Sequence, residues 1–285
     1  MKICIWRTGH SICDTVAEAL AEGLNGSVIS TQEASIQVVK AYDLHVAYGV
    51  LRGTAEIFRL ADEAKIPWVH LDKGYTNPHH YSGTYRISYK GTQARWHEGI
   101  PRKKWDGEIA PWRNSGGYIL ICPPTEYVCE FFGVDRDYWL ASAICNCRNT
   151  SYQIRDKGDD WPLELAMEGA LAVITFNSSV GWKALQMGIP VLSDVNHSII
   201  GSHYGETDLQ KLLEKSLSTP DTRRELFEAM SGHDYTLEQI RKGEACELIN
   251  HYLSGSASMT GKQSLPMSAS IPSKNTLQAR FQSNT

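Results

Sequence analysis

Residues 175–194, TFNSSVGWKALQMGIPVLSD, hold the pattern that decides the fold of this chain. The β-branched run Ala172–Phe176 predicts a short strand, and Asn177–Ser179 brings polar side chains of the kind that begin helices. A helix should follow over about Ser179–Met187, because Gly188 and the proline two residues later are typical of a helix end. The next run, Val-Leu-Ser, predicts a second strand. The stretch therefore indicates a strand–turn–helix–strand unit, which is typical of α/β proteins.

The turn within this stretch is a candidate phosphate-binding site. A strand that leads directly into a helix places free backbone N–H groups and the positive end of the helix dipole at the edge of the sheet. The side chains of Asn177, Ser178 and Ser179 add groups that can donate hydrogen bonds to a phosphate. The alternative is a structural role, in which the two serines only cap a buried helix.

The pattern Asn-Ser-Ser-Val-Gly-x-x-Ala-Leu-x-x-Gly-Ile-Pro-Val, residues 177–191, resembles the donor-binding turn of GT-B glycosyltransferases. The resemblance is to the bacterial capsule-assembly and phage-type sugar transferases in particular. It implies two Rossmann-like, doubly wound domains that face a cleft, a nucleotide-sugar donor with a UDP-sugar as the first candidate, and no required metal. The family usually carries a glutamate, which holds the ribose hydroxyls, where this chain has Lys183. Lys183 is therefore expected to approach a phosphate instead.

A second donor-binding element is expected after the strand predicted at residues 151–154. Arg155 and Lys157 follow that strand, and in the transferases that this chain resembles a basic pair at this point faces the donor phosphates. Arginine offers two parallel donors and lysine a point charge, which together suit a diphosphate leaving group. A surface charge cluster is the alternative. Thr125, in the turn after the strand predicted at residues 118–122, completes the candidate donor set.

Alternating strands and helices in both halves of the chain predict two α/β domains. The sequence Asn114–Gly117 is typical of a linker, so we expect an acceptor domain at residues 1–114 and a donor domain at residues 115–253. Residues 254–285 are rich in Ser, Thr, Gln and Asn and have few large apolar side chains. They are expected to form a disordered tail.

Two residues of the first domain are candidate catalytic bases. His10 lies in the loop after the first predicted strand, where many GT-B enzymes place a residue that faces the acceptor. Asp72 follows the strand predicted at residues 67–71, and a carboxylate at that strand end can accept the proton of an attacking hydroxyl. The alternatives are a loop-capping histidine and an aspartate that closes a turn before Gly74. The sequence favours Asp72 over His10.

Residues 77–113 mix aromatic and basic side chains throughout the segment. Aromatic faces stack on sugars or bases, and basic side chains neutralise phosphates, so we expect an acceptor platform here. A solvated excursion over the first sheet is the alternative. The acceptor-binding candidates are Tyr75, Arg86, Arg102, Lys103 and Lys104.

Composition sets broad limits on the class of protein. The 285 residues are 42% hydrophobic and 21% charged, as in ordinary globular proteins, and the net charge of −4 argues against a general affinity for polyanions. No stretch has the length of a bilayer-spanning helix, and the first residues lack the pattern of a secretory signal. Together with seven scattered cysteines, these features predict a cytoplasmic protein.

These features predict a glycosyltransferase that moves a sugar from a nucleotide-activated donor to an acceptor hydroxyl. The acceptor is expected to be a hydroxymethylated base in bacteriophage DNA or a surface glycan, and the sequence does not choose between them. A nucleotide-sugar 2-epimerase and a non-catalytic protein that binds glycan or DNA are the alternatives. The sequence lacks G-x-x-x-x-G-K-[ST], and no G-x-G-x-x-G follows the first strand, so a P-loop kinase and a dinucleotide oxidoreductase are disfavoured.

Overall fold

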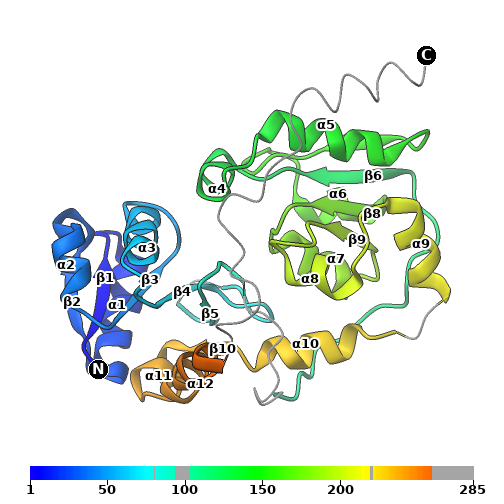
Figure 1. Ribbon diagram of the computed structural model, residues 1–285. Coiled ribbons are helices and arrows are strands. Elements are labelled where there is room, and N and C mark those ends of the chain that lie inside the picture. The colour runs from blue at the N-terminus through cyan, green and yellow to red at the C-terminus, as the bar shows by residue number, and fades with distance from the viewer. Residues whose placement is uncertain (80, 94–102, 219–220, 259–285) are drawn as a thin grey trace.

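The computed structural model describes residues 1–79, 81–93, 103–218 and 221–258. In this part of the chain the strands form two sheets, each in a lobe of its own (Figure 1). We call the described residues of 1–93 and 234–258 the first lobe, and those of 103–231 the second lobe. The expected architecture, two α/β units built on parallel strands, is confirmed.

The strands of the first sheet are β1 (Ile3–Arg7), β2 (Ser27–Ser30), β3 (Leu44–Tyr48), β4 (Trp68–Lys73), β5 (Thr84–Tyr89) and β10 (Asp234–Thr236). Their order across the sheet is β10-β5-β4-β3-β1-β2. Strands β1 to β4 are parallel, whereas β5 is antiparallel to both of its neighbours. The central strand β3 is buried along its whole length, as expected for a parallel strand with helices on both faces.

The helices of the first lobe are α1 (Ser11–Leu24), η1 (Thr31–Glu33), α2 (Ile36–Lys40), α3 (Thr54–Glu63), α11 (Leu237–Arg241) and α12 (Ala245–Ser258). They build two apolar cores, one on each face of the sheet. Leu20 of α1 and Ile249 of α12 belong to the core that contains Val46. Phe58 of α3 packs in the other core, which contains Trp6.

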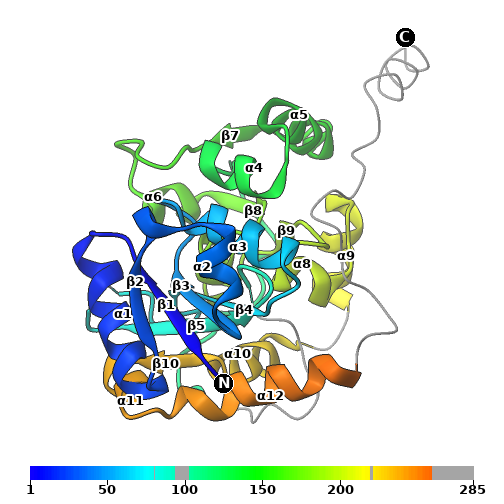
Figure 2. The same ribbon diagram turned by 60° about the vertical axis from the view of Figure 1, so that its left-hand side comes forward.

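The strands of the second sheet are β6 (Tyr118–Cys122), β7 (Tyr152–Ile154), β8 (Ala170–Thr175) and β9 (Val191–Ser193). They are parallel, in the order β7-β6-β8-β9. The helices of this lobe are α4 (Glu126–Phe132), α5 (Arg136–Cys147), α6 (Leu163–Glu168), α7 (Val180–Gln186), α8 (Ile199–Tyr204), α9 (Leu209–Ser218) and α10 (Arg223–Ser231). Helices α5 and α10 lie on opposite sides of the lobe (Figure 2).

The stretch that decides the fold forms the elements expected from its sequence. Strand β8 is followed by the short helix α7 and then by β9. Gly188 follows the helix with a φ of 74°, a left-handed conformation that glycine adopts without strain. A Cβ at this position would lie 2.0 Å from the carbonyl oxygen of Pro111, so the close approach of the neighbouring segment also requires glycine.

The chain returns to the first lobe after α10, which corrects the expected extent of the second unit. Strand β10 pairs with β5, with Asp234 opposite Arg86, and α11 and α12 pack against α1. Residues 234–253 therefore complete the first sheet and its core, although the sequence placed them with the second unit. A three-residue strand is too short to show a period-two pattern, so its pairing partner cannot be read from the sequence.

Helix α12 extends to Ser258, past residue 254, where the tail was expected to begin. Residues 259–285 lie outside the described part of the chain, and the disordered tail stays a prediction. Among the described helices, none combines the length and the apolar character needed to cross a bilayer.

Candidate functional site

The second sheet has a topological switch point between β6 and β8. From β6 the chain first moves to β7 on one side and then to β8 on the other. In open α/β sheets, ligands bind in the crevice that such a reversal creates at the carboxyl ends of the strands. Thr125 lies in the loop after β6, and Asn177–Ser179 form the turn after β8. These donor-binding candidates therefore flank the switch point.

The turn after β8 presents two serines in different environments. Ser178 Oγ accepts a hydrogen bond from Val180 N at 3.3 Å, which fixes the start of α7. Ser179 is exposed and its side chain makes no capping hydrogen bond, so its hydroxyl is accessible to a ligand. The carbonyl oxygen of Asn177 accepts from Gln93 Nε2 at 2.6 Å. The turn is thus held by Ser178 and Asn177 and leaves Ser179 exposed.

Arg155 and Lys157 follow β7, next to β6. Arg155 Nε donates to the carbonyl oxygen of Trp161 at 2.8 Å, which orients the guanidinium group. Burial raises the pKa of the Cys122 thiol at the end of β6 to about 12, and the charge of Arg155 acts in the opposite direction. Lys157 Nζ donates to the hydroxyl of Tyr127 at 3.0 Å. Both cations therefore lie at the carboxyl edge of the second sheet.

Lys183 is paired with a carboxylate. Its Nζ lies 2.6 Å from Glu164 Oε1, and the two side chains are largely exposed. The pair joins α6 to α7 and partly neutralises the charge that was expected to approach a phosphate. Thr125 immediately precedes α4, and its side chain makes no capping hydrogen bond to that helix.

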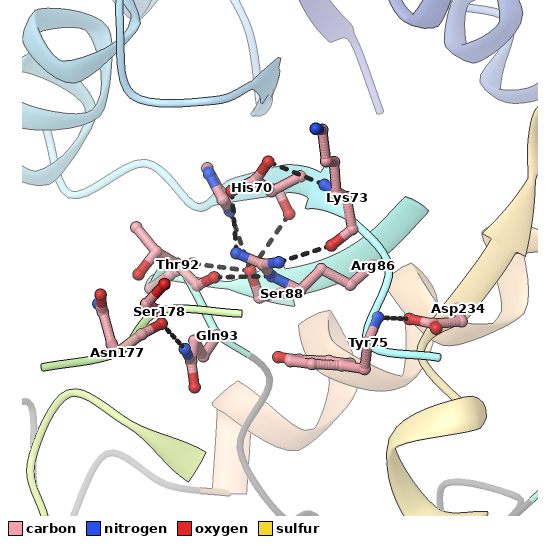
Figure 3. Close-up of polar contacts among 12 residues, drawn as sticks. His70, Lys73, Tyr75, Arg86, Ser88, Thr92, Gln93, Asn177, Ser178 and Asp234 are labelled. Carbon is pink, nitrogen blue, oxygen red and sulfur yellow. Dashed lines mark hydrogen bonds and ion pairs between the residues drawn. The ribbon is translucent and has the colours of Figure 1, made fainter. Parts of the chain in front are cut away.

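Asp72 is the second-last residue of β4 and forms an ion pair with Arg86 of β5. Arg86 Nη2 lies 2.9 Å from Asp72 Oδ2. The guanidinium group also donates to the carbonyl oxygens of Lys73, at 2.5 Å, and Thr92, at 3.1 Å (Figure 3). Burial raises the pKa of Asp72, but the charge of Arg86 and smaller contributions from its neighbours bring it below its usual value. A carboxylate of low pKa in an ion pair is a weak base, so the structure favours Asp72 less than the sequence does.

His10 lies at the switch point of the first sheet. That point falls between β1 and β3, because the chain moves from β1 to β2 on one side and then to β3 on the other. His10 is exposed and immediately precedes α1, and its Nδ1 lies 3.9 Å from Cys13 Sγ. In the described part of the chain no carboxylate forms an ion pair with His10, and its side chain is exposed to solvent.

Most acceptor candidates make contacts within the protein. Arg86 is buried and donates to three neighbours, as described above. Lys103 Nζ donates to the carbonyl oxygen of Asp234 at 2.9 Å and lies 3.8 Å from the centre of the Tyr235 ring. Lys104 is exposed and paired with Asp106 at 2.9 Å. Arg102 lies outside the described residues.

Tyr75, the fifth acceptor candidate, joins the two lobes. Its ring packs on Trp182 of α7, with 4.7 Å between the ring centroids, and it is 4% exposed. Its backbone N–H donates to Asp234 Oδ1 at 3.1 Å (Figure 3). Tyr75 therefore contributes to the packing between the lobes rather than to an open platform.

Gln93 is a residue of the site that sequence reasoning missed. Its amide group bridges the lobes. Nε2 donates to the carbonyl oxygen of Asn177 at 2.6 Å (Figure 3). Oε1 accepts from Ile199 N at 2.8 Å. Asn177 lies in the turn after β8, and Ile199 is the first residue of α8, the helix that follows β9. Nothing in the local sequence marks this glutamine, because its partners are 84 and 106 residues away.

Tyr127 is a second residue that the sequence did not single out. Burial raises the pKa of its phenol, but the hydrogen bond from Lys157 lowers it, and the net pKa is below the ordinary value. The negative charge of Asp72 in the first lobe acts in the opposite direction to this hydrogen bond and raises the pKa of the phenol.

Within residues 1–79, 81–93, 103–218 and 221–258, no group of three or more His, Cys, Asp or Glu side chains is arranged to hold a metal ion.

Comparisons with known proteins give likenesses in structure only. No protein-family model matches this chain, and no curated protein sequence matches it. The KpsC beta Kdo 2,4 transferase of Thermosulfurimonas dismutans is 10% identical, with a TM-score of 0.47, over 85% of this chain and 98% of the other. The KpsC beta Kdo 2,7 transferase of the same organism is 12% identical, with a TM-score of 0.46, over 88% and 100%. The UDP-GlcNAc 2-epimerase of Methanocaldococcus jannaschii is 10% identical, with a TM-score of 0.31, over 88% and 99%.

Proposed function

We propose that this protein is a glycosyltransferase that binds a nucleotide-sugar donor in its second lobe. The observation that carries the proposal is the position of Asn177–Ser179 and Thr125 on the two sides of the switch point of the second sheet. Loops at such a point bind ligands in open α/β sheets. The serine-rich turn and the neighbouring cations Arg155 and Lys157 are suited to a phosphorylated ligand.

In the proposed reaction, an acceptor oxygen attacks the anomeric carbon of the donor sugar. The bond between that carbon and the phosphate oxygen breaks, and its electron pair leaves with the nucleotide. Arg155 and Lys157 stabilise the negative charge on the leaving phosphate, and the Ser179 hydroxyl donates to it. These groups supply the stabilisation without requiring a metal ion.

If the reaction inverts the anomeric carbon, a base must take the proton of the acceptor hydroxyl. His10 fits this role better than Asp72, because His10 is accessible whereas Asp72 is held in an ion pair with Arg86. In this proposal Asp72 orients Arg86 at the edge of the first sheet. A retaining reaction would not need a dedicated base.

Nucleotide binding tests the donor site. We expect isothermal titration of the full chain with UDP, CMP, GDP and ADP to show selective binding of one nucleotide. Arg155→Ala should weaken that binding about tenfold, because a hydrogen bond between charged groups contributes about 1.5–3 kcal/mol. Ser179→Ala should also weaken it about tenfold, because the hydroxyl donates to a charged phosphate and such a bond contributes at least about 1.5 kcal/mol.

Arg59→Ala is the matched control for this titration. Arg59 is an exposed arginine of α3 in the first lobe, paired with Glu56 and Glu63. Its removal should leave nucleotide affinity unchanged. Equal affinity in the wild type, Arg155→Ala and Ser179→Ala would show that the turn after β8 has a structural role only.

The contacts of the acceptor segment favour a glycan over duplex DNA as the acceptor. Binding to DNA requires cations that can replace the counterions of the phosphates. Among the described candidates, Arg86, Lys103 and Lys104 each contact other groups of the protein. We therefore propose a hydroxyl of a surface glycan, with a hydroxymethylated base in DNA as the alternative.

A DNA-binding measurement separates the two acceptors. We expect duplex DNA, with or without hydroxymethylated bases, to show no binding by fluorescence anisotropy even at low salt. Binding that falls steeply as salt rises, and that is lost when Lys103 and Lys104 are both changed to glutamate, would instead support the DNA acceptor.

A further inference from the structure

The second lobe contains a cavity of about 630 Å³ between α5 and the carboxyl ends of β8 and β9. Sites for small ligands have volumes of about 300–1,000 Å³, so the cavity is large enough to be one. Its lining combines aromatic rings with hydrogen-bonding groups. The lining residues on which the following argument depends are Phe132, Ser142, Phe176, Asp194 and His197.

Three of these rings pack together in the lining. The ring centroids of Phe132 and His197 are 4.9 Å apart, and those of Phe176 and His197 are 5.2 Å apart. Phe176 is 2% exposed, and its carbonyl oxygen accepts from Ser193 Oγ at 2.7 Å, so this part of the lining is firmly held. A planar aromatic ligand is the class of molecule that packs favourably on such rings.

His197 adds a hydrogen-bonding group of defined direction. Its Nδ1 lies 2.8 Å from Asp194 Oδ1, and the same oxygen accepts from the backbone N–H of His197 at 2.8 Å. Burial raises the pKa of Asp194, but its hydrogen bonds with His197 lower it below its usual value. The Asp194 carboxylate favours the tautomer in which Nδ1 carries the proton, and in that tautomer Nε2 is the acceptor. The edges of nucleobases carry N–H groups that match such an acceptor.

The cavity adjoins the turn after β8. Phe176 lines the cavity, and Asn177 begins the turn at the next position. Consecutive Cα atoms are about 3.8 Å apart, so a ligand whose ring lies in the cavity can reach the turn with the group attached to that ring. A nucleotide has this division into a planar ring and a charged phosphate end.

We propose that the cavity binds the base of the donor nucleotide and that His197 selects among bases through Nε2. The phosphates then lie on Asn177–Ser179 and Arg155. This inference rests on the proposed function, because it assumes that the turn holds the phosphates of the same molecule.

A variant that fills the cavity tests this inference. Ser142 lines the cavity from α5 and is exposed, so Ser142→Trp adds a ring there without removing a core side chain. We expect this variant to bind the preferred nucleotide about thirtyfold more weakly, the order of effect of losing one stacked base. Its affinity for inorganic pyrophosphate, which has no base, should equal that of the wild type. Ser142→Ala is the control and should match the wild type for both probes.

A second variant tests the role of His197. His197→Phe keeps an aromatic ring but removes the Nε2 acceptor. We expect its preference for one nucleotide over the other three to fall about fivefold, because one hydrogen bond of average strength contributes about 1 kcal/mol. Its affinity for pyrophosphate should be unchanged. Thermal unfolding of each variant checks that the protein remains folded.

The outcomes separate the two proposals. Unchanged nucleotide affinity in a folded Ser142→Trp protein would overturn the base site, as would a wild type that binds all four nucleotides no more tightly than pyrophosphate. If Ser142→Trp weakens binding but Arg155→Ala and Ser179→Ala do not, the cavity binds the base and the proposed phosphate site fails instead.

Discussion

Replacing Arg223 with methionine is expected to lower the free energy of unfolding by about 4 kcal/mol. The side chain is 1% exposed and lies 2.6 Å from Asp221. It donates to the carbonyl oxygens of Ala110 and Leu185, both at 2.9 Å, and its guanidinium carbon is 3.8 Å from the centre of the Trp112 ring. Methionine keeps an apolar side chain of similar length but leaves these oxygens without their donor. Denaturant unfolding of the full chain measures the loss.

The adjacent arginine provides a matched control. Arg224 is exposed and donates to the carbonyl oxygens of Trp105, at 3.0 Å, and Gly107, at 3.2 Å. Arg224→Met should therefore lower the free energy of unfolding by no more than about 1 kcal/mol, because water can replace the lost bonds at an exposed position. Equal losses in the two variants would contradict the role given to Arg223.

Replacing Asp234 with alanine is expected to lower the free energy of unfolding by about 3 kcal/mol, because it leaves buried donors unpaired. The carboxylate is 5% exposed and accepts from the backbone N–H groups of Tyr75, at 3.1 Å, and Thr76, at 2.9 Å. It also accepts from the hydroxyls of Thr76, at 2.8 Å, and Thr84, at 3.1 Å. Gly74 allows this close packing, because a Cβ there would lie 2.0 Å from Thr84 Oγ1. Denaturant unfolding again gives the measurement.

Asp43→Ala is the control for this substitution. Asp43 is an exposed aspartate before β3, and its Oδ2 accepts one backbone hydrogen bond from Lys2 N at 2.6 Å. Its removal should cost less than about 1 kcal/mol. A loss of the same small size in Asp234→Ala would mean that the N–H groups of Tyr75 and Thr76 find other partners once the carboxylate is gone.

The elements that sequence reasoning found are those with strong local signals. Strand β8, helix α7 and strand β9 were predicted because β-branched residues, polar capping residues, a glycine and a proline follow one another within a few positions. The helix end at Gly188 depends on a conformation that its own residue type favours. Such features need no knowledge of distant contacts.

The pairing of β10 with β5 could not be predicted in this way. Asp234–Thr236 reads locally as the start of a helix, because Thr236 and Gln239 form a capping box. Its partner strand, β5, lies about 150 residues earlier in the chain, and the hydrogen bond from Thr84 to Asp234 spans this separation. Long-range pairing of a short strand is decided by packing, which a local pattern does not record.

In the candidate site, too, local sequence signals predicted the positions of the loops but not their contacts with distant residues. The loops after β1, β4, β6 and β8 were placed at strand ends from the sequence, and the structure puts them there. The partners of the candidate residues were not foreseen: Arg86 holds Asp72, Glu164 pairs with Lys183, and Gln93 bridges the lobes. Each of these contacts joins side chains that are separate in sequence, so the residue type alone does not reveal whether a charge is available to a ligand.

The return of the chain to β5 has a consequence for synthesis on the ribosome. All strands of the second sheet, residues 118–193, emerge before β10, whereas the first sheet is complete only once residues 234–236 have emerged. The second lobe can therefore fold first, although multidomain chains generally fold from the N-terminus onward. Until then β5 is an open edge of the nascent first sheet, the kind of edge to which other strands add. The first lobe is thus the part of the described chain whose synthesis begins first and whose sheet is completed last.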